Sequence, residues 1–197
     1  MVDDLKNSDI DVYDNFFLEK DFKDFEDHIV YNGDFPWFLA KDSGKTVHGD
    51  HNIKKNKDVI EYLQFNHILL MEGKTEANSD YYRLFEEKIP HILNKLKLSN
   101  IEILRAKLNL QTQITNNKPH FYNTPHIDAY YKHTVFMLYL NDSDGDTVFV
   151  DDDKNIVKKV SPKKNRVVVF NGMNYHAGSH PYNSDRRIVL NVNFKYK

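Results

Sequence analysis

The sequence predicts a mainly β protein with flanking helices, of the sandwich, barrel or jelly-roll type. Two observations support this fold class. After residue 100 the chain consists of short β-branched or aromatic runs separated by turn residues, whereas apolar residues at helical spacing occur only before it. No internal repeat or linker divides the 197 residues, so we expect a single domain spanning 1–197.

Two helices are expected in the N-terminal region, residues 1–100. Three large apolar side chains recur at helical spacing within residues 21–30, and a longer apolar stripe runs through residues 79–98. Ser79 is suited to the N-cap of the second helix, and Pro90 is expected to kink or split it. We expect both helices to pack against the outside of one sheet system.

Six strands are expected in residues 101–197. They are the runs 101–113, 134–140, 146–150, 156–160, 166–171 and 187–195. The stretch "NDSDGD" between the second and third runs raises the question of a calcium loop. In an EF-hand the glycine is sixth and helices flank the loop, whereas Gly145 is fourth from Asp142 and strands flank it. A hairpin turn is therefore expected there.

Composition and charge exclude several classes of protein. The chain has no cysteine, which excludes disulfides, zinc–thiolate sites, iron–sulfur clusters and a thiol nucleophile. A net charge of -2 gives no overall basic bias towards nucleic acid. No apolar run approaches the ~20 residues of a membrane span and the N-terminus lacks a signal-like segment, so a cytoplasmic protein without a membrane partner is expected. The oligomeric state is left open.

The pattern His-x-Asp occurs twice, and the two copies differ in setting. A chance match is expected in a chain with 10 histidines and many aspartates. His48 and Asp50 lie in a polar, glycine-containing stretch typical of a surface loop. His126 and Asp128 open the strand-rich region, where residues two apart point to the same face. His126 and Asp128 could therefore bind one ion together.

A third ligand is offered by His176, which follows an apolar strand and a glycine-containing turn. Two imidazoles and one carboxylate form the facial arrangement that leaves positions open on Fe(II) for a cosubstrate and for oxygen. A chelating 2-oxo acid also needs a partner for its far carboxylate, and an arginine supplies a bidentate, permanently charged one. Arg186 and Arg187 head the last predicted strand and are the candidates for this role.

The register of the last strand favours Arg187. Because side chains alternate, Arg187 shares a face with Val189, Asn191 and Asn193, whereas Arg186 shares the other face with four apolar residues. The apolar face should pack into the fold and the mixed face should line a cavity. Arg187 is therefore expected to point inwards, and Arg186 towards solvent or a surface acid.

Other side chains near these motifs have open roles. His133 and His180 break the ligand spacing, and we expect them on the surface or supporting the ligands. Packing is favoured for Tyr130 and Tyr131, although both could line a substrate entrance. A contact with the cosubstrate is open for three further side chains, which are Asn109, Gln111 and Tyr122.

The segment from about 101 to 195 resembles the Fe(II)/2-oxoglutarate-dependent oxygenases, particularly the prolyl-4-hydroxylase-like branch and its short phage and bacterial versions. The stretches "PHID", "LYLNDSDGDTVFVD", "PKKNRVVVFNGMNYHAGSHP" and "RRIVLNVNF" occur in the order and approximate spacing of that family. The resemblance implies a double-stranded β-helix, a jelly-roll or cupin-like core with the iron at its open end.

The resemblance also implies roles for individual residues. His126, Asp128 and His176 fall on the catalytic iron ligands, and Arg187 falls on the anchor for the 2-oxoglutarate carboxylate. The implied cofactor is Fe(II), with 2-oxoglutarate and O2 as cosubstrates and ascorbate as a candidate reductant. Hydroxylation of an aliphatic carbon, in a small molecule or a protein side chain, with succinate and CO2 as coproducts, is the implied reaction.

Two interpretations from other classes remain beside this one. A jelly roll could bind metal without turnover and serve as a sensor or structural module. A Zn(II) hydrolase could use the same three ligands, but it would have no need for Arg187.

Overall fold

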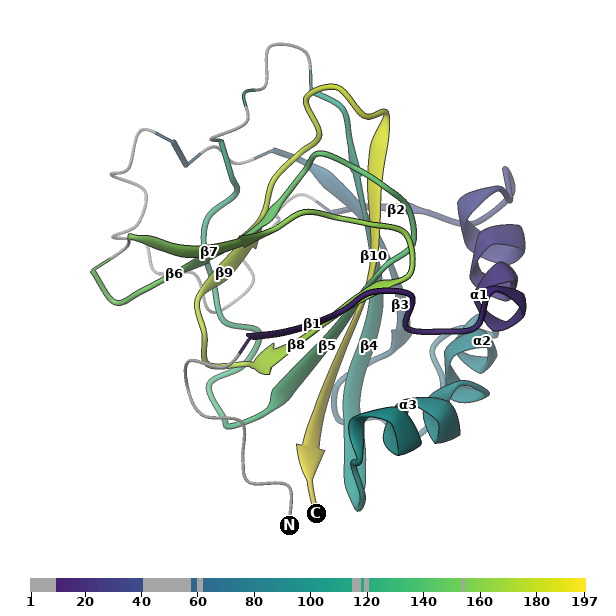
Figure 1. Cartoon of the computed structure of the whole chain (residues 1–197). Coiled ribbons are helices and arrows are strands. Elements are labelled where there is room, and N and C mark those ends of the chain that lie inside the picture. The colour runs from purple at the N-terminus through teal and green to yellow at the C-terminus, as the bar shows by residue number, and fades with distance from the viewer. Residues whose placement is uncertain (1–9, 41–57, 60–61, 115–117, 119–120, 154) are drawn as a thin grey trace.

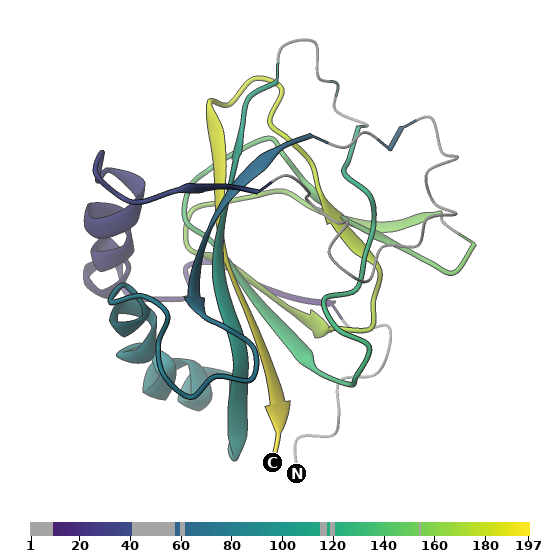
Figure 2. The same ribbon diagram turned by 180° about the vertical axis from the view of Figure 1, so that it is seen from behind.

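The computed structural model describes residues 10–40, 58–59, 62–114, 118, 121–153 and 155–197 (Figure 1). Within these residues, two antiparallel sheets face each other and the helices cover one outer face (Figure 2). The larger sheet has the order β1-β8-β5-β10-β4-β3-β2, and the smaller sheet has the order β7-β6-β9. The strands are β1 (Ile10–Tyr13), β2 (Phe38–Ala40), β3 (Gln64–Leu70), β4 (Ile101–Thr112), β5 (Thr134–Tyr139), β6 (Thr147–Val150), β7 (Ile156–Val160), β8 (Arg166–Asn171), β9 (His176–Gly178) and β10 (Arg186–Tyr196).

From β4 onwards the chain winds between the two sheets. It passes from β4 and β5 in the larger sheet to β6 and β7 in the smaller one, returns to β8, crosses to β9, and ends in β10 at the centre of the larger sheet. This is the winding of a jelly roll, so the predicted mainly β class is confirmed. All six predicted strands are present, and no bound differs from its prediction by more than about one residue.

The two predicted helical regions are confirmed, with corrections in detail. The first is α1 (Glu19–Phe25), continued by a π-helical turn (Glu26–Val30). The second is divided into α2 (Tyr82–Glu86) and α3 (Ile89–Leu96), with Pro90 in the first turn of α3, where its missing N–H costs nothing. The prediction that Ser79 is an N-cap is wrong.

Tyr81 occupies the N-cap of α2, and no side chain caps that helix. The hydroxyl of Ser79 instead lies 2.7 Å from His67 Nε2 on β3 and accepts from the backbone N–H of Tyr81 at 3.3 Å. Ser79 therefore ties the start of the helical region to the larger sheet.

Three N-terminal strands were not expected from the sequence. β1 pairs with β8 at one edge of the larger sheet, while β3 pairs with β4 and β2 with β3 at the other. β1 and β2 have only four and three residues, too few for an alternating pattern to be recognised. The larger sheet is consequently wider than the C-terminal strands could make alone.

The segment 141–146 is not a hairpin turn, and this expectation is wrong. It joins β5 in the larger sheet to β6 in the smaller sheet, so its flanking strands are not paired with each other. The carboxylate of Asp144 accepts from the backbone N–H groups of Tyr182, Asn183 and Ser184, at 3.1, 2.8 and 3.3 Å. The acidic residue thus holds two loops together at this end of the barrel.

The larger sheet has an apolar outer face. Four side chains of β10 point outwards into a buried cluster with the helices, and they are Ile188, Leu190, Val192 and Phe194. Ala106 and Leu108 of β4 join the same cluster with no exposed surface. Burial of each large side chain contributes about 1.5–3 kcal/mol relative to exposure.

The inner face of the same two strands is polar near its middle. Side chains of β4 alternate, so that Lys107, Asn109 and Gln111 point between the sheets. Arg187, Val189 and Asn191 of β10 line the same space.

Within the described residues no helix is both long and apolar enough to cross a membrane.

Candidate metal centre and its pocket

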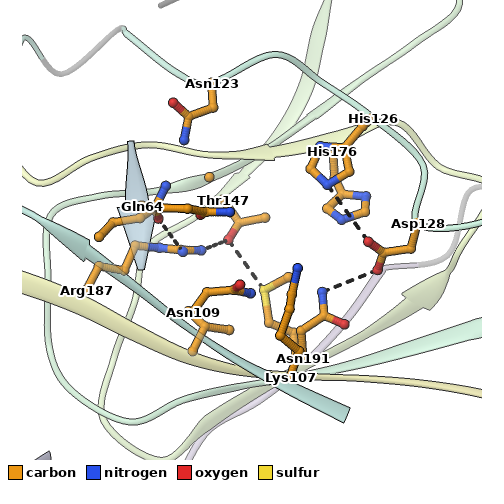
Figure 3. A pocket seen from close by; sticks show the side chains of 14 residues that line it. Gln64, Lys107, Asn109, Asn123, His126, Asp128, Thr147, His176, Arg187 and Asn191 are labelled. Carbon is orange, nitrogen blue, oxygen red and sulfur yellow. Dashed lines mark hydrogen bonds and ion pairs between the residues drawn. The ribbon is translucent and has the colours of Figure 1, made fainter. Parts of the chain in front are cut away.

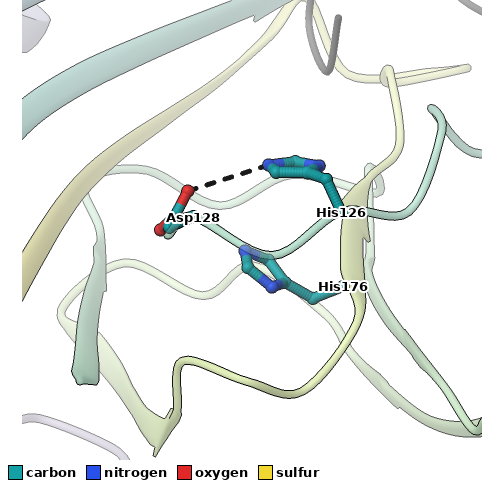
Figure 4. Close-up of side chains that lie close together, drawn as sticks. All are labelled: His126, Asp128 and His176. Atoms are coloured by element: carbon teal, nitrogen blue, oxygen red, sulfur yellow. Dashed lines mark ion pairs between the residues drawn. The ribbon is translucent and has the colours of Figure 1, made fainter. Parts of the chain in front are cut away.

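His126, Asp128 and His176 converge at one end of the space between the sheets (Figure 4). One donor atom from each lies within 4.8 Å of the others. The segment around His126 pairs with β9, because the backbone N–H of His126 donates to the carbonyl of His176 at 3.0 Å and the reverse bond measures 3.1 Å. This reciprocal pair places the two rings 5.0 Å apart.

Backbone contacts fix the orientation of both imidazoles. His126 Nδ1 lies 3.2 Å from the carbonyl of Thr124, and His176 Nδ1 lies 3.0 Å from the carbonyl of Asn174. A carbonyl oxygen only accepts, so Nδ1 carries the proton in each ring and Nε2 keeps its lone pair. Nε2 of His126 faces Asp128 Oδ1 at 3.8 Å. Both rings therefore present the donor atom that a metal needs.

Electrostatics keep these imidazoles neutral. Burial, with the neighbouring His176, lowers the pKa of His126 to about 4. Burial also lowers the pKa of His176 below its ordinary value. Because a metal ligand must be unprotonated, both rings are in the binding form at neutral pH.

The carboxylate of Asp128 is held by three side chains. Arg105 Nη2 lies 2.8 Å from Oδ1, and Asn191 donates to Oδ2 at 3.3 Å. With its amide nitrogen facing these acceptors, Asn193 donates to Oδ2 at 3.1 Å and its oxygen accepts from Arg105 at 3.2 Å. Two bonds to Oδ2 use both of its lone pairs, so the remaining lone pair is on Oδ1, the oxygen nearer His126.

Asp128 is ionised despite its burial. Burial alone would raise the pKa of this carboxyl, but Arg105 and the other nearby cationic groups hold it well below its ordinary value. Two neutral imidazoles and one carboxylate form a donor set that fits Fe(II) and related divalent ions.

Arg187 lies at the other end of the same pocket (Figure 3). Its side chain is buried, with Nη1 donating to Gln111 Oε1 and Nη2 to Thr147 Oγ1, both at 2.7 Å. Its Nε has no partner among the described residues. Burial lowers the pKa of Arg187, and the nearby Tyr139 and Asp146 offset this only in part.

Gly178 makes room for this arginine. A Cβ atom at this position would lie 3.0 Å from Gln111 Oε1 and 3.1 Å from Arg187 Nη1. Both contacts are tighter than ordinary van der Waals packing, so a side chain here would displace the guanidinium or its partner. The absence of a side chain at Gly178 therefore allows Arg187 and Gln111 to keep their contact at this end of the pocket.

The residues expected at the site are brought together in large part. The triad lies together, Arg187 points inwards, and Arg186 is exposed. Asn109 and Gln111 line the pocket. Tyr122 is buried in a separate cluster with Val148, Val150 and Ala177. His48 and Asp50 lie outside the described residues.

The neighbouring histidines and tyrosines are placed differently from expectation. His133 and His180 are both buried, which excludes a surface position for either. His133 Nδ1 lies 2.8 Å from the carbonyl of Tyr131, and His180 Nδ1 lies 3.0 Å from the carbonyl of Thr112, so both rings are bound to backbone. Tyr130 is 67% exposed, and the expectation that it packs is wrong.

Several polar residues of the site were not identified from the sequence. Arg105 and Lys107 belong to "RAKLNLQ", where charged or amide residues alternate with apolar ones, and that alternation was a usable signal. Thr147 and Asn123 line the pocket from loop and strand ends and gave no signal. Gln64 lies on β3, a strand that was not expected.

Comparison with protein families agrees with this geometry. The profile of the 2OG-Fe(II) oxygenase superfamily matches residues 112–195, a range that contains the triad and Arg187. The resemblance stated from the motifs is thereby confirmed, with Fe(II) and 2-oxoglutarate as cofactor and cosubstrate. No curated protein sequence matches the chain significantly.

Solved structures with the same fold are distant in sequence. An oxidoreductase of the 2OG-Fe(II) oxygenase family from Burkholderia pseudomallei has a TM-score of 0.65 at 11% identity, covering 94% of this chain and 84% of that one. The viral collagen prolyl hydroxylase of Paramecium Bursaria Chlorella virus-1, solved as a 2OG complex, has a TM-score of 0.55 at 16% identity, covering 98% and 97%. HygX from Streptomyces hygroscopicus, with nickel and 2-oxoglutarate bound, has a TM-score of 0.58 at 9% identity, covering 97% and 84%. The predicted double-stranded β-helix is therefore confirmed.

Proposed function

We propose that this chain, a 2-oxoglutarate-dependent dioxygenase that belongs to the 2OG-Fe(II) oxygenase superfamily over residues 112–195, hydroxylates an aliphatic carbon. One C–H bond becomes C–OH, and 2-oxoglutarate and O2 become succinate and CO2. One oxygen atom enters the product and the other enters succinate, so the reaction balances without a further reductant.

One observation carries this proposal. A pocket holds the His126, Asp128 and His176 triad at one end and the buried guanidinium of Arg187 at the other. Metal-dependent hydrolysis does not require a buried arginine opposite the metal. A purely structural metal site does not require coordination positions that are open to a ligand. A dicarboxylic 2-oxo acid would use both ends of this pocket. Its 2-oxo carboxylate would chelate the metal, and its far carboxylate would pair with Arg187.

The roles of the three ligands follow from their donor atoms. His126 and His176 would each hold Fe(II) through Nε2, and Asp128 through Oδ1. When bound, the iron supplies activation of oxygen, which side chains alone do not provide. The protein holds the donor atoms by backbone bonds to both histidines and by the amide and guanidinium contacts to Asp128, so the site is preorganised.

Arg187 would bind the far carboxylate of 2-oxoglutarate. Gln111 and Thr147 hold the guanidinium in place by two hydrogen bonds, which leaves other donors to face the pocket. A charge-assisted pair in a buried site is stronger than an exposed one and is directional. Arg187 thus selects a dicarboxylic 2-oxo acid over a monocarboxylic one.

The substrate would approach from the side of His126. Its side chain is 23% exposed, compared with 4% for Asp128. His176 is buried. Tyr130 follows Asp128 closely in the chain and is 67% exposed. A peptide side chain, as in the similar viral collagen prolyl hydroxylase, or a small molecule would fit this approach.

The decisive experiment is binding of 2-oxoglutarate to the metal-loaded full chain. Isothermal titration with Mn(II), followed by 2-oxoglutarate, should show one metal site and one cosubstrate site. With Fe(II), ascorbate and 2-oxoglutarate, slow release of succinate is expected even without the substrate. A metal-loaded protein that does not bind 2-oxoglutarate would contradict the proposal and favour a non-catalytic metal-binding module.

A His176→Ala variant identifies the metal site. It should lose Mn(II) binding but remain folded, with some loss of unfolding temperature in the absence of metal, because the ring packs against Phe149 and Phe170 of a buried cluster. Retention of metal by this variant, or loss of metal in His48→Ala, would move the site to the other His-x-Asp motif.

A further inference from the structure

Lys107 is a second cation in the pocket, separate from Arg187. It lies in the middle of β4, opposite Asn191 of β10, and its side chain points between the sheets. Figure 3 shows it rising into the pocket, with Arg187 on one side and the two histidines on the other. No sequence motif of the metal site includes this residue.

Lys107 has no acidic partner in the portion of the chain that the structure describes. Asp128 is the one carboxylate that lines the pocket, and its closest cation is Arg105 at 2.8 Å. Both oxygens of Asp128 are engaged by Arg105 and by the amides of Asn191 and Asn193. The ammonium of Lys107 is thus left facing the pocket.

Two cations line this pocket, and no ion pair among the described residues joins either of them to a carboxylate. Arg187 is buried and Lys107 is half-buried. Burial lowers the pKa of Lys107 to about 8, and it also lowers the pKa of Arg187. A charge in a desolvated pocket is stabilised only by pairing or by hydrogen bonds to an anion. The pocket therefore favours a ligand that carries two negative charges.

The two cations serve different ends of that ligand. Lys107 is paired across the sheet with Asn191, whose amide donates to Asp128, so Lys107 enters the pocket beside the triad. Arg187 instead contacts Gln111 and Thr147 at the opposite end of the pocket. One cation therefore lies beside the metal end and the other beside the far end.

We propose that Lys107 is a second anchor for the 2-oxo acid, donating to the carboxylate at its metal-chelating end while Arg187 holds the far carboxylate. This inference rests on the proposed function, since it concerns the same ligand. Lys107 would orient the carboxylate that chelates the metal and neutralise part of its charge.

The test uses two ligands and four variants of the full chain loaded with Mn(II). The ligands are 2-oxoglutarate and its 5-methyl ester, in which the far end carries no charge but the metal end is unchanged. The variants are Lys107→Met, Lys107→Arg, Arg187→Met and, as a control that removes one exposed lysine, Lys159→Met. Titration calorimetry measures metal affinity first and ligand affinity second.

Lys107→Met should weaken both ligands by the same factor, about tenfold or more, because a charge-assisted bond at the shared end is lost. Arg187→Met should weaken 2-oxoglutarate and leave the ester unchanged. Lys107→Arg should recover part of the affinity, and Lys159→Met should match the wild type. Mn(II) affinity should be unchanged or higher in Lys107→Met, because a cation near Asp128 and His126 is removed, and this readout excludes general damage.

Two results would overturn the inference. One is wild-type affinity of Lys107→Met for both ligands, which would mean that Lys107 does not touch the cosubstrate. The other is a loss confined to 2-oxoglutarate with the ester unaffected, which would place Lys107 at the far end with Arg187. A wild-type protein that binds Mn(II) but not 2-oxoglutarate would instead contradict the proposed function itself.

Discussion

The two faces of the larger sheet are built from the same strands but serve different purposes. On β4 and β10, every second side chain enters the apolar cluster under the helices, and the side chains between them carry the charges and amides of the pocket. Neighbouring residues such as Leu108 and Asn109 therefore belong to different regions of the molecule. Substitutions one position apart should separate stability from ligand binding.

The largest effect is expected on the outer face, for Leu108→Ala. Leu108 is fully buried between the sheet and the helices, so its truncation should lower the free energy of unfolding by about 2–5 kcal/mol. Mn(II) affinity should not change at temperatures where the variant is folded. Urea unfolding and metal titration of the same preparation test this separation. A loss of metal affinity in the folded variant would mean that the two faces are coupled.

A comparable effect on binding, without loss of stability, is expected from Arg187→Gln on the inner face. Loss of a charge-assisted pair in a closed pocket costs about 2–5 kcal/mol, much of it from the charge left unpaired. The affinity for 2-oxoglutarate should fall at least about tenfold with metal affinity nearly unchanged. Arg186→Gln is the matched control, because its exposed side chain is one position away. If calorimetry showed a larger loss of 2-oxoglutarate affinity for Arg186→Gln than for Arg187→Gln, the assignment of Arg187 to the inner face would be wrong.

A smaller effect is expected from Asn191→Ala, which removes a donor to Oδ2 of Asp128. Side chains that hold a metal ligand in place typically contribute about 10- to 100-fold in metal affinity. Asn193 and Arg105 still hold the carboxylate in this variant, so the lower end of that range is expected. Competition of Mn(II) with a chelator measures the change. Unchanged affinity would show that Asn191 is not needed to orient Asp128.

The smallest effect is expected at the start of β8, at the ion pair between Asp14 and Arg166. The hydrogen bonds from Arg166 lower the pKa of Asp14 to about 2, so this stability is present at neutral pH and is lost as the pH falls from about 4 to 2. Because Asp14 is 40% exposed, solvent screening limits the contribution to less than about 1 kcal/mol. Asp14→Asn should lower stability by that amount at neutral pH and by less at about pH 3 in urea unfolding. An equal loss at both pH values would exclude the ion pair as its cause.

The clustering of His126, Asp128 and His176 and the inward face of β10 were predicted correctly because each depends on local pattern, whereas the binding of metal by this cluster stays a prediction. The alternation of Arg187, Val189, Asn191 and Asn193 with apolar residues is visible in the chain and decides which face is buried. Lys107 follows the same rule on β4, but it was not predicted because no chemical motif marks that strand as one that lines a site.

Other features depended on contacts between distant segments. β3 supplies Gln64 to the pocket only because it pairs with β4, and no local pattern states that pairing. The hairpin expected at 141–146 was wrong because turn residues indicate a change of direction, but not which sheet the next strand joins. The organisation of residues 1–197 as a single domain, with a helix-containing region over 1–100 and a core over 101–197, stays a prediction.

The short strand β9 has a further consequence for the spacing of the two ends of the pocket. Its first residue, His176, is a proposed metal ligand, and its third, Gly178, borders the guanidinium of Arg187. Two steps along an extended strand span about 6.6 Å. The pitch of the main chain therefore sets the spacing between the proposed metal ligand and the strand position beside Arg187.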